Sequence, residues 1–347
     1  MASARRSIDT LQAGRALAAL AVVLYHTNIT LALPKYLGTD IVPLFDFADC
    51  GVQYFFVLSG FVIWLIHARD IGSPGRAPAF LRKRVQRIYP PLWGVLLLLL
   101  PASLLLSAGG DELHLWTLAS AFLVLPVSHE VLLGTEWTLR HEVLFYLMFA
   151  LLIWRWRAGA VAMALWLALS AAGGLVRLDF PASFLFSSQH LLFAFGAAAC
   201  MTWNRGAPRA PGLLLGLGLG QFAATWALLF LLRGCVHHGA LTDWSYGMGA
   251  ALTVLGGAGL EMRGSLRLPR WLLFLGEASY SIYLVHFPVV SALCRVAARL
   301  RGAGLDPLLL AAVAVLAAAA GIAFHLWVER PLLGLFQQRP VARLQQS

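Results

Sequence analysis

The sequence predicts an all-α fold, a polytopic transmembrane bundle of about ten helices with both termini in the cytoplasm. The 347 residues are 60% hydrophobic and have a mean hydropathy of +0.76. Only 12% of them are charged, about half of the roughly 25% that is usual in soluble proteins. Apolar runs of spanning length also recur from one end of the chain to the other.

Each predicted span is an apolar run close to the ~20 residues that cross a hydrocarbon core as a helix. The longest polar connections are residues 31–49 and 68–87. Neither can hold a separate soluble domain, so we expect one membrane-embedded domain over residues 1–347. The predicted spans are, in chain order, 11–31, 50–68, 88–107, 136–154, 159–176, 185–203, 211–232, 242–260, 272–294 and 307–328.

The run Leu113–Val127 is shorter, and we interpret it as a re-entrant or interfacial segment, with an eleventh span as the alternative. With ten spans, most of the 26 lysines and arginines fall on the side that holds both termini. Cytoplasmic loops carry the excess of positive charge, which makes that side cytoplasmic. The cations Arg295, Arg299 and Arg301 are an exception, because they fall on the outer side.

Charge and cysteine content argue against several function classes. The net charge of +10 could indicate nucleic-acid binding, but the cations lie in short loops between apolar runs, so we expect no nucleic-acid partner. Four scattered cysteines without a CxxC pair predict neither a disulfide framework nor a metal site. The Gly-rich stretches 216–220 and 256–259 lie inside spans and match no nucleotide-binding motif, which favours helix packing.

The first span contains two ionisable residues, Arg15 and His26. Such residues inside a membrane are costly and are by default functional-site hypotheses. Eleven helical steps separate them by roughly 16 Å, about half of a ~30 Å hydrocarbon core. We therefore expect Arg15 near one membrane face and His26 in the other half. The alternative is that Arg15 snorkels to lipid headgroups and His26 is merely interfacial.

Further local patterns follow in order along the chain. They are Gly51-Val-Gln-Tyr-Phe-Phe-Val-Leu-Ser-Gly60, Arg82-Lys-Arg-Val-Gln-Arg-Ile-Tyr-Pro90, Trp137-Thr-Leu-Arg-His-Glu-Val-Leu-Phe-Tyr146, Gly276-Glu-Ala-Ser-Tyr-Ser-Ile-Tyr-Leu-Val-His-Phe-Pro288 and Trp327-Val-Glu-Arg-Pro331.

Together with Arg15 and His26, this ordered set resembles acyltransferase family 3, the integral-membrane O-acyltransferases that mostly modify sugars. The likeness covers nearly the whole chain, and the WTLRHEVLFY form looks more like the subgroup acting on exopolysaccharides. Many relatives add a C-terminal esterase-like domain, which we do not expect here. The resemblance implies a multi-pass enzyme of the bacterial inner membrane. It would use acyl-CoA as co-substrate and hold no permanently bound cofactor.

Acyl transfer to a hydroxyl needs a base for the hydroxyl proton, and histidine, with an unperturbed pKa of about 6.5, suits that role. His26 is the candidate base. Such a base is usually oriented by a carboxylate, and we expect Glu142 at a similar depth, so the two are predicted to pair. Arg15 completes the candidate catalytic set. The alternative is that Glu142 pairs with Arg140 or His141 and only stabilises an interface.

The acyl-CoA donor implied by the resemblance carries phosphates, which arginine binds through a planar fork. Arg84 and Arg87 are three residues apart, so they share a helix face. Arg82 and Tyr89 complete the candidate donor site at the cytoplasmic end of the third span. Basic residues at cytoplasmic helix ends are normally topology anchors, and spacing alone favours that interpretation.

The remaining candidates are expected to line the substrate site. Their alternatives are ordinary ones, because aromatic and small polar residues in spans usually pack, and a buried histidine is as often a satisfied core residue. Glu329 is expected to cap the last helix near the cytoplasm. The candidate substrate-binding residues are Phe56, Ser59, Trp137, Tyr283 and His286.

The leading functional prediction is an O-acetyltransferase that acts on a cell-envelope glycan, an exopolysaccharide or a lipid-linked sugar, in contact with membrane lipids. An alternative is acylation of a small hydroxylated natural product such as a macrolide. A proton-coupled transporter is a further hypothesis, because intramembrane His, Glu and Arg also serve transport. The two halves of the chain show no clear repeat of the kind that transporters often have.

Overall fold

A computed structural model describes residues 8–107, 115–128, 132–206, 208–232, 239–300 and 304–337. Within these ranges the chain is helical and contains no strand, which confirms the all-α prediction.

One long helix corresponds to each of the ten predicted spans. Pro211 and Pro307 lie in the first turns of two of them, where a missing backbone N–H is tolerated. The long helices are α1 (Asp9–Leu31), α2 (Gly51–His67), α3 (Ala77–Ser107), α5 (Trp137–Trp154), α6 (Trp156–Gly173), α8 (His190–Asn204), α9 (Pro211–Leu231), α10 (Ala240–Met262), α11 (Arg270–Ala297) and α12 (Asp306–Phe324). The third begins well before residue 88, because the basic segment continues the same helix.

Short helical elements connect the long ones. They are η1 (Pro43–Cys50), η2 (Ala68–Asp70), η3 (Pro74–Arg76), α4 (Leu115–Leu123), α7 (Ala182–Leu185), a π turn (His325–Glu329) and α13 (Arg330–Gln337).

The segment predicted to be re-entrant or interfacial contains α4, and its first two residues lie outside the described ranges. Nine residues of helix cover roughly 14 Å, less than half of a ~30 Å hydrocarbon core. The helix packs on α3, where Tyr89 and Trp93 donate hydrogen bonds to carbonyl oxygens of Leu123 and Phe122 at 3.1 and 2.8 Å. As described, α4 is too short to cross the core alone.

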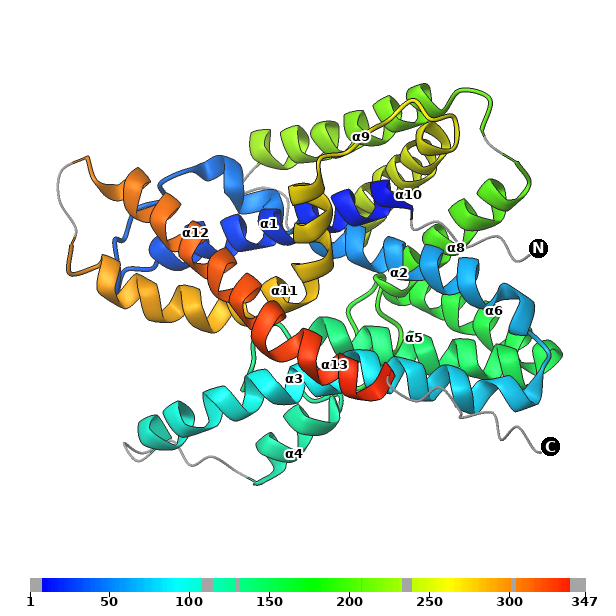
Figure 1. The fold of residues 1–347 in the computed structure, drawn as a ribbon, viewed down its shortest axis with the longest axis horizontal. Coiled ribbons are helices and arrows are strands. Elements are labelled where there is room, and N and C mark those ends of the chain that lie inside the picture. Colours follow the sequence, from blue (N-terminus) through cyan, green and yellow to red (C-terminus); the bar gives the residue numbers. More distant parts are fainter. Residues whose placement is uncertain are drawn as a thin grey trace, which may run out of the picture.

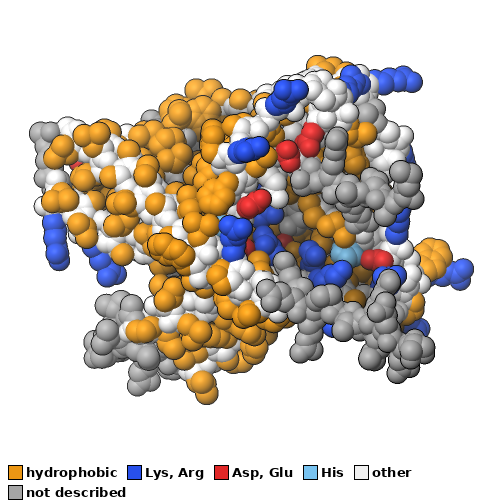
Figure 2. Space-filling view, viewed as in Figure 1, with side chains coloured by type: hydrophobic (Ala, Val, Ile, Leu, Met, Phe, Trp, Pro, Cys, Tyr) orange, Lys and Arg blue, Asp and Glu red, His pale blue; other side chains and the backbone are white. Residues whose placement is uncertain are grey.

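Within the described residues, the segments long and apolar enough to cross a membrane number seven: α2, α5, α6, α7–α8, α9, α11 and α12–α13. The helices α1, α3 and α10 carry polar or charged residues in their apolar runs and are not among the seven. The count of ten spans and the cytoplasmic location of both termini stay predictions. Figure 2 shows that hydrophobic side chains dominate the left half of one face, whereas most charged side chains lie on the right half.

Helix α1 lies against α2, α10, α11 and α12 in the interior of the bundle (Figure 1). Two glycines allow its neighbours to approach closely. A Cβ atom on Gly276 of α11 would lie 2.1 Å from the Gln12 carbonyl oxygen, and one on Gly51 of α2 would lie 2.3 Å from the Ala18 carbonyl oxygen. Small residues at helix contacts are the usual means of packing helices in membranes.

Helix α11 contains Pro288 and changes direction along its length (Figure 1). Proline has no N–H to bond the carbonyl of residue i−4, and its ring clashes with that turn, so it bends helices. The segment before the bend carries Ser279, Ser281, Tyr283 and His286. The bend therefore lies next to the part of α11 that faces α1.

We expect Gly276→Ala to destabilise the protein, because the added methyl group would meet the α1 backbone. Overpacking of this kind costs about 1–3 kcal/mol. Gly216→Ala in α9 is the matched control, since a Cβ there meets nothing within 4 Å. Replacing an exposed glycine in a helix with alanine stabilises the folded protein by about 0.5–1 kcal/mol. Thermal unfolding in detergent measures both variants, and equal stability would contradict the close-packing argument.

Candidate active site

Among the described residues, two cavities with polar side chains in their lining lie next to each other in the helix bundle. The arginine cavity has a volume of about 160 Å³ and the histidine cavity about 280 Å³. Val52 of α2 and Tyr283 of α11 line both, so their side chains form the partition between them. The arginine cavity is lined by Arg15, Val52, Phe55, Phe56, Leu58, Ser59, Val62, Ile63, Arg84, Arg87, Ile88, Thr138, Leu139, Glu142, Tyr146, Ser279, Tyr280 and Tyr283. The histidine cavity is lined by Tyr25, His26, Asp49, Val52, Gln53, Trp137, Gln189, Gly239, Asp243 and Tyr283.

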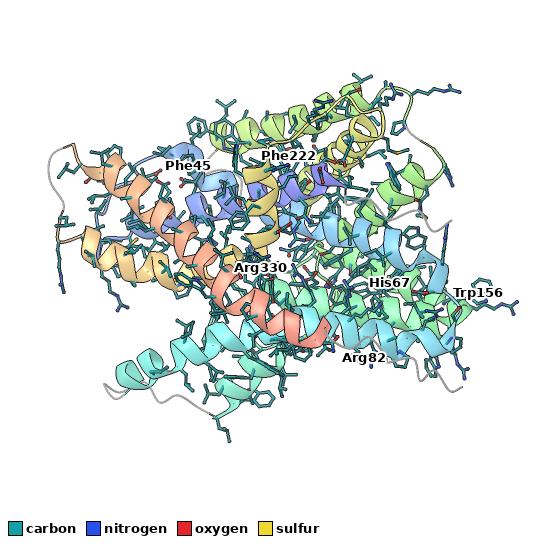
Figure 3. The ribbon with its side chains drawn as sticks, in the orientation of Figure 1. Phe45, His67, Arg82, Trp156, Phe222 and Arg330 are labelled. Atoms are coloured by element: carbon teal, nitrogen blue, oxygen red, sulfur yellow. The ribbon has the colours of Figure 1, made fainter. Side chains whose placement is uncertain are left out.

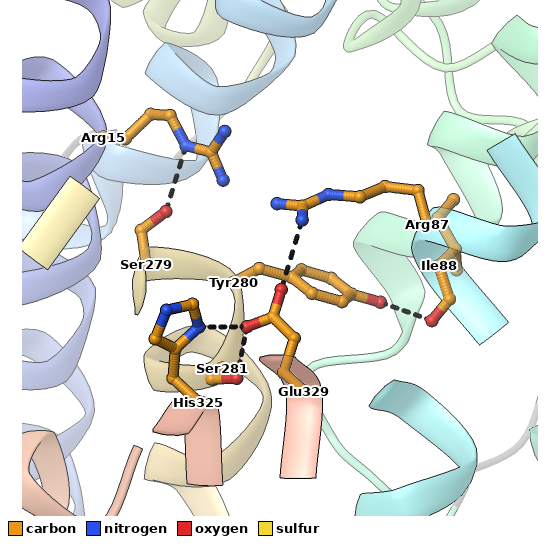
Figure 4. A network of polar contacts seen from close by, with 8 residues as sticks. All are labelled: Arg15, Arg87, Ile88, Ser279, Tyr280, Ser281, His325 and Glu329. Carbon is orange, nitrogen blue, oxygen red and sulfur yellow. Dashed lines mark hydrogen bonds and ion pairs between the residues drawn. The ribbon is translucent and has the colours of Figure 1, made fainter. Parts of the chain in front are cut away.

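Three arginines line the arginine cavity, Arg15 from α1 and Arg84 and Arg87 from α3. Arg15 donates from Nε to Ser279 Oγ at 3.0 Å. Arg87 donates from Nη1 to Glu329 Oε1 at 3.2 Å. Figure 4 shows these two guanidinium groups extending toward the same space from opposite sides. The structure thus joins two sequence motifs that are about seventy residues apart.

Glu329 orients Arg87 from a fully buried position, with 0% of its surface exposed. Its other oxygen, Oε2, accepts from Ser281 Oγ at 2.6 Å and lies 2.7 Å from His325 Nδ1 (Figure 4). His325 and Glu329 both belong to the π turn, an irregularity that often marks functional sites. Glu329 therefore does not cap the last helix, as expected from the sequence, but forms the centre of a buried polar cluster.

Arg84 and Glu142 face the same cavity from α3 and α5. The Arg84 guanidinium lies 5.8 Å from the centre of the Tyr146 ring, and its buried Nε has no hydrogen-bond partner among the described residues. Glu142 Oε1 accepts from Ser59 Oγ at 2.8 Å and from the Tyr146 hydroxyl. Three guanidinium groups thus meet the carboxylates of Glu142 and Glu329, which leaves an excess of positive charge suited to an anion.

His26 lines the other cavity, and its ring is held from three sides. Its Nδ1 lies 3.1 Å from the Val22 carbonyl oxygen and 3.1 Å from Nε2 of His286. The rings of Tyr25 and Phe287 contact it edge-on, with ring centres 4.9 and 5.2 Å away. These contacts leave the Nε2 side of His26 as the one without a hydrogen bond to any described residue.

Amide and carboxylate groups line the rest of the histidine cavity. Gln53 donates from Nε2 to Asp243 Oδ1 at 3.0 Å, and Ser188 donates to Asp243 Oδ2 at 2.9 Å. The amide oxygens of Gln53 and Gln189 are buried without a hydrogen-bond partner among the described residues. Trp137 contributes an aromatic wall. Unpaired acceptors beside an aromatic surface suit a ligand rich in hydroxyl groups.

Most predicted site residues lie at these two cavities. Two residues predicted to bind the donor line neither cavity. Arg82 is exposed on α3 (Figure 3), and Tyr89 donates a hydrogen bond from its hydroxyl to the Leu123 carbonyl oxygen of α4. His286 is fully buried behind His26. The predicted residues that line a cavity are Arg15, His26, Phe56, Ser59, Arg84, Arg87, Trp137, Glu142 and Tyr283.

The predicted pairing of His26 with Glu142 is wrong. The two residues line different cavities, and Glu142 accepts from Ser59 and Tyr146. The cause is the length of α5 between Trp137, which lines the histidine cavity, and Glu142. Five helical steps cover roughly 7.5 Å, enough to carry Glu142 past the partition.

Several residues of the site were not found by sequence reasoning. Gln53, Gln189 and Asp243 come from α2, the start of α8 and α10, and they belong to no recognisable short motif. Gln53 alone could have been noticed, since it lies inside the Gly51–Gly60 pattern. The role of Glu329 depended on the π turn, which no residue pattern predicts.

A second histidine pair lies apart from His26. His141 Nδ1 lies 2.9 Å from His190 Nε2, and His190 Nδ1 lies 3.2 Å from Ser170 Oγ. His190 is fully buried and packs against the Trp166 ring, with ring centres 4.4 Å apart. The pair lines neither cavity.

We expect Glu329→Gln to lower thermal stability, because it removes the buried carboxylate that pairs with the partly exposed Arg87. Removing one partner of a fully buried ion pair costs about 3–5 kcal/mol, and the partial exposure of Arg87 lowers the cost expected here. Glu277→Gln on α11 is the matched control, since Glu277 is exposed and is expected to shift the melting temperature little. Similar melting temperatures for the two variants would argue against a charge-pairing role for Glu329.

Comparison with known proteins identifies the family of the chain. Residues 8–328 match an acyltransferase domain family. The exopolysaccharide production protein ExoZ of Rhizobium meliloti strain 1021 is 33% identical over 305 residues, which cover 83% of this chain and 90% of that protein. The acyltransferase MdmB of Streptomyces mycarofaciens is 28% identical, over 94% of this chain and 92% of its own length.

Nodulation protein 10 of Rhizobium leguminosarum bv. viciae is 27% identical, over 83% of this chain and 84% of its own length. No solved structure matches the chain. The family match extends from α1 to the π turn, so it includes both cavities and every arginine and histidine described at them. The chain therefore belongs to acyltransferase family 3, and it is a multi-pass membrane O-acyltransferase.

Proposed function

We propose that the protein moves an acyl group, acetyl in the first instance, from acyl-CoA to a hydroxyl of a cell-envelope or exopolysaccharide sugar. The observation that carries the proposal is that two cavities of unlike chemistry meet at Val52 and Tyr283. One holds cations suited to a phosphorylated donor, and the other holds a histidine and groups that bind hydroxyls. A donor and an acceptor entering from the two cavities would meet at this partition.

The donor side of the proposal rests on Arg15, Arg84 and Arg87. Arginine binds phosphate bidentately, and the buried Nε of Arg84 has no partner within the described residues. Apolar side chains such as Phe55 continue the cavity toward the partition. Phosphates bound by the arginines would leave the acyl thioester to extend along this apolar part.

The acceptor side of the proposal rests on the histidine cavity. Free amide oxygens of Gln53 and Gln189 would accept hydrogen bonds from hydroxyl groups, and Trp137 offers a flat apolar face to a sugar ring. The name of the Rhizobium relative, an exopolysaccharide production protein, supports a polysaccharide acceptor. A lipid-linked sugar would satisfy the same contacts.

In the proposed reaction, His26 accepts the proton of the acceptor hydroxyl while the oxygen attacks the thioester carbonyl carbon. A new carbon–oxygen bond forms and the carbon–sulfur bond breaks. The departing thiolate takes the proton from His26, so the products are the ester and free CoA thiol. We propose direct transfer, which is supported by the absence of a histidine hydrogen-bonded to Ser59 among the described residues, where Ser59 donates to Glu142.

We also propose that the arginine cavity opens toward the cytoplasm of a bacterial inner membrane and the histidine cavity toward the outer side. The excess of positive charge near the predicted cytoplasmic ends of the spans supports this orientation. Family membership removes the main support for the transporter hypothesis, because intramembrane His, Glu and Arg are accounted for by the acyltransferase site.

His26→Ala is expected to abolish transfer of label from acetyl-CoA to glycan in membranes that contain the protein. Loss of a general base lowers the rate about 100-fold to 10,000-fold. The amount of folded, inserted protein is measured in parallel by size exclusion in detergent. A folded variant that transfers label at the normal rate would contradict the role of His26.

Arg84→Ala is expected to raise KM for acetyl-CoA about tenfold to a hundredfold, the scale of a charge-assisted hydrogen bond. With acetyl-pantetheine, a donor that lacks phosphate, Arg84→Ala should have the same KM for the donor as the wild type. Lys83→Ala is the matched control, because Lys83 is an exposed cation on the same helix. Equal effects of Arg84→Ala on both donors would contradict phosphate binding at this arginine.

A further inference from the structure

His286 is a polar residue in a position where an apolar side chain would be expected. It is 0% exposed, it lies on α11 two residues before Pro288, and it lines neither cavity. A buried imidazole is costly unless its nitrogens are hydrogen-bonded. Both nitrogens of His286 have partners, and these partners determine where its proton lies.

The Nδ1 atom of His286 lies 2.7 Å from the Tyr283 carbonyl oxygen and 3.2 Å from the Ile282 carbonyl oxygen. A carbonyl oxygen can only accept, so Nδ1 must carry the proton. In a neutral imidazole the other nitrogen, Nε2, then carries a lone pair. His286 is thereby fixed by the α11 backbone as a hydrogen-bond acceptor directed at α1.

The same logic applies to His26. Its Nδ1 lies 3.1 Å from the Val22 carbonyl oxygen and 3.1 Å from Nε2 of His286, and both of these are acceptors. Nδ1 of His26 must therefore be the donor, shared between them. The lone pair of neutral His26 is left on Nε2, which has no hydrogen-bond partner among the described residues, and His26 itself lines the histidine cavity.

We infer that His286 is the positioning residue that fixes His26 in the tautomer whose Nε2 can accept the hydroxyl proton. A carboxylate, Glu142, was expected to contact His26. His286 occupies that position instead. The inference rests on the proposed role of His26 as the base. It assigns to His286 a function through His26 and no contact with substrate.

The proton balance of the reaction is consistent with this assignment. When the acceptor oxygen attacks the thioester, its proton moves to Nε2 of His26, which becomes an imidazolium ion. The hydrogen bond from Nδ1 to His286 then has a charged donor, and such bonds are roughly twice as strong as neutral ones. The proton leaves with the thiolate sulfur, and His26 returns to the starting tautomer without a proton passing to His286.

A neutral partner also avoids a permanent ion pair between α1 and α11. Two buried charges in this interface would carry a desolvation cost that their attraction often does not repay. The histidine pair instead strengthens only when His26 is charged, which is during the reaction. Ring contacts from Tyr25 and Phe287 keep the His26 ring in the orientation that the hydrogen bond requires.

The test compares His286→Phe with His286→Gln, measuring kcat, KM for acetyl-CoA, KM for the acceptor, and the amount of folded protein. Phenylalanine keeps the ring but offers no acceptor, whereas the glutamine amide oxygen can accept from His26 Nδ1. We expect His286→Phe to lower kcat at least 100-fold, with both KM values within about twofold of the wild type. The kcat of His286→Gln should be at least tenfold higher than the kcat of His286→Phe.

The second histidine pair supplies the matched control. His190 is also fully buried with its Nε2 bonded to another histidine, yet it lies outside both cavities. His190→Phe and His190→Gln are expected to leave kcat per folded molecule within about twofold of the wild type. A loss of kcat in His190→Phe as large as in His286→Phe would overturn the inference, because it would reflect damage from any disrupted histidine pair.

Two further results would also overturn it. One is an equal loss of kcat in His286→Phe and His286→Gln, and the other is a loss confined to the amount of folded protein. If His286→Phe does not accumulate, His286→Leu replaces it as the variant without an acceptor. Failure of the proposed function is distinguishable, since in that case His26→Ala itself remains active. An inactive His26→Ala beside a fully active His286→Phe would reject the inference alone.

Discussion

Close contact between the backbone of α1 and those of α2 and α11 is the constraint on which the site depends. Gly51 and Gly276 face carbonyl oxygens of α1 at distances that no side chain could occupy. The hydrogen bonds from Arg15 to Ser279 and from His26 to His286 both cross the interface between α1 and α11. In a bilayer no hydrophobic force draws helices together, so close packing and polar bonds must hold this interface.

The site is organised by separation of unlike polar groups along the helices. Arg15 and His26 occupy one helix, but each reaches a different cavity, and α5 repeats the arrangement with Glu142 and Trp137. On one side of the partition the arginines lie near the carboxylates of Glu142 and Glu329, whereas on the other side His26 and His286 are hydrogen-bonded to each other. This separation places His26, the proposed base, in a different cavity from the three arginines.

Much of this organisation could be predicted from the sequence, and the limits are physical. The length of the apolar runs predicted the ten long helices of the described residues. The spacing of Arg84 and Arg87 predicted that both lie on one face of α3, and both line the arginine cavity. The partner of His26 could not be predicted, because pairing depends on the relative rotation and depth of two helices, and one step of roughly 1.5 Å along α5 decides which cavity a side chain enters. The burial of Glu329 could not be predicted either, because it lies in a π turn that no residue pattern indicates. Gln53, Gln189 and Asp243 meet only in three dimensions.

The thin partition between the cavities has a consequence for the cell that houses the enzyme. In the proposed orientation the cavities would open toward opposite sides of the membrane, and Val52 and Tyr283, which line both, would separate two water-accessible spaces. Each charge that leaked past them would then dissipate about 2.3 kcal/mol per 100 mV. The Tyr283 hydroxyl bonds to Thr138 Oγ1 at 3.0 Å, which ties the partition to α5. The same side chains that let an acyl group reach its acceptor must therefore also serve as an electrical insulator.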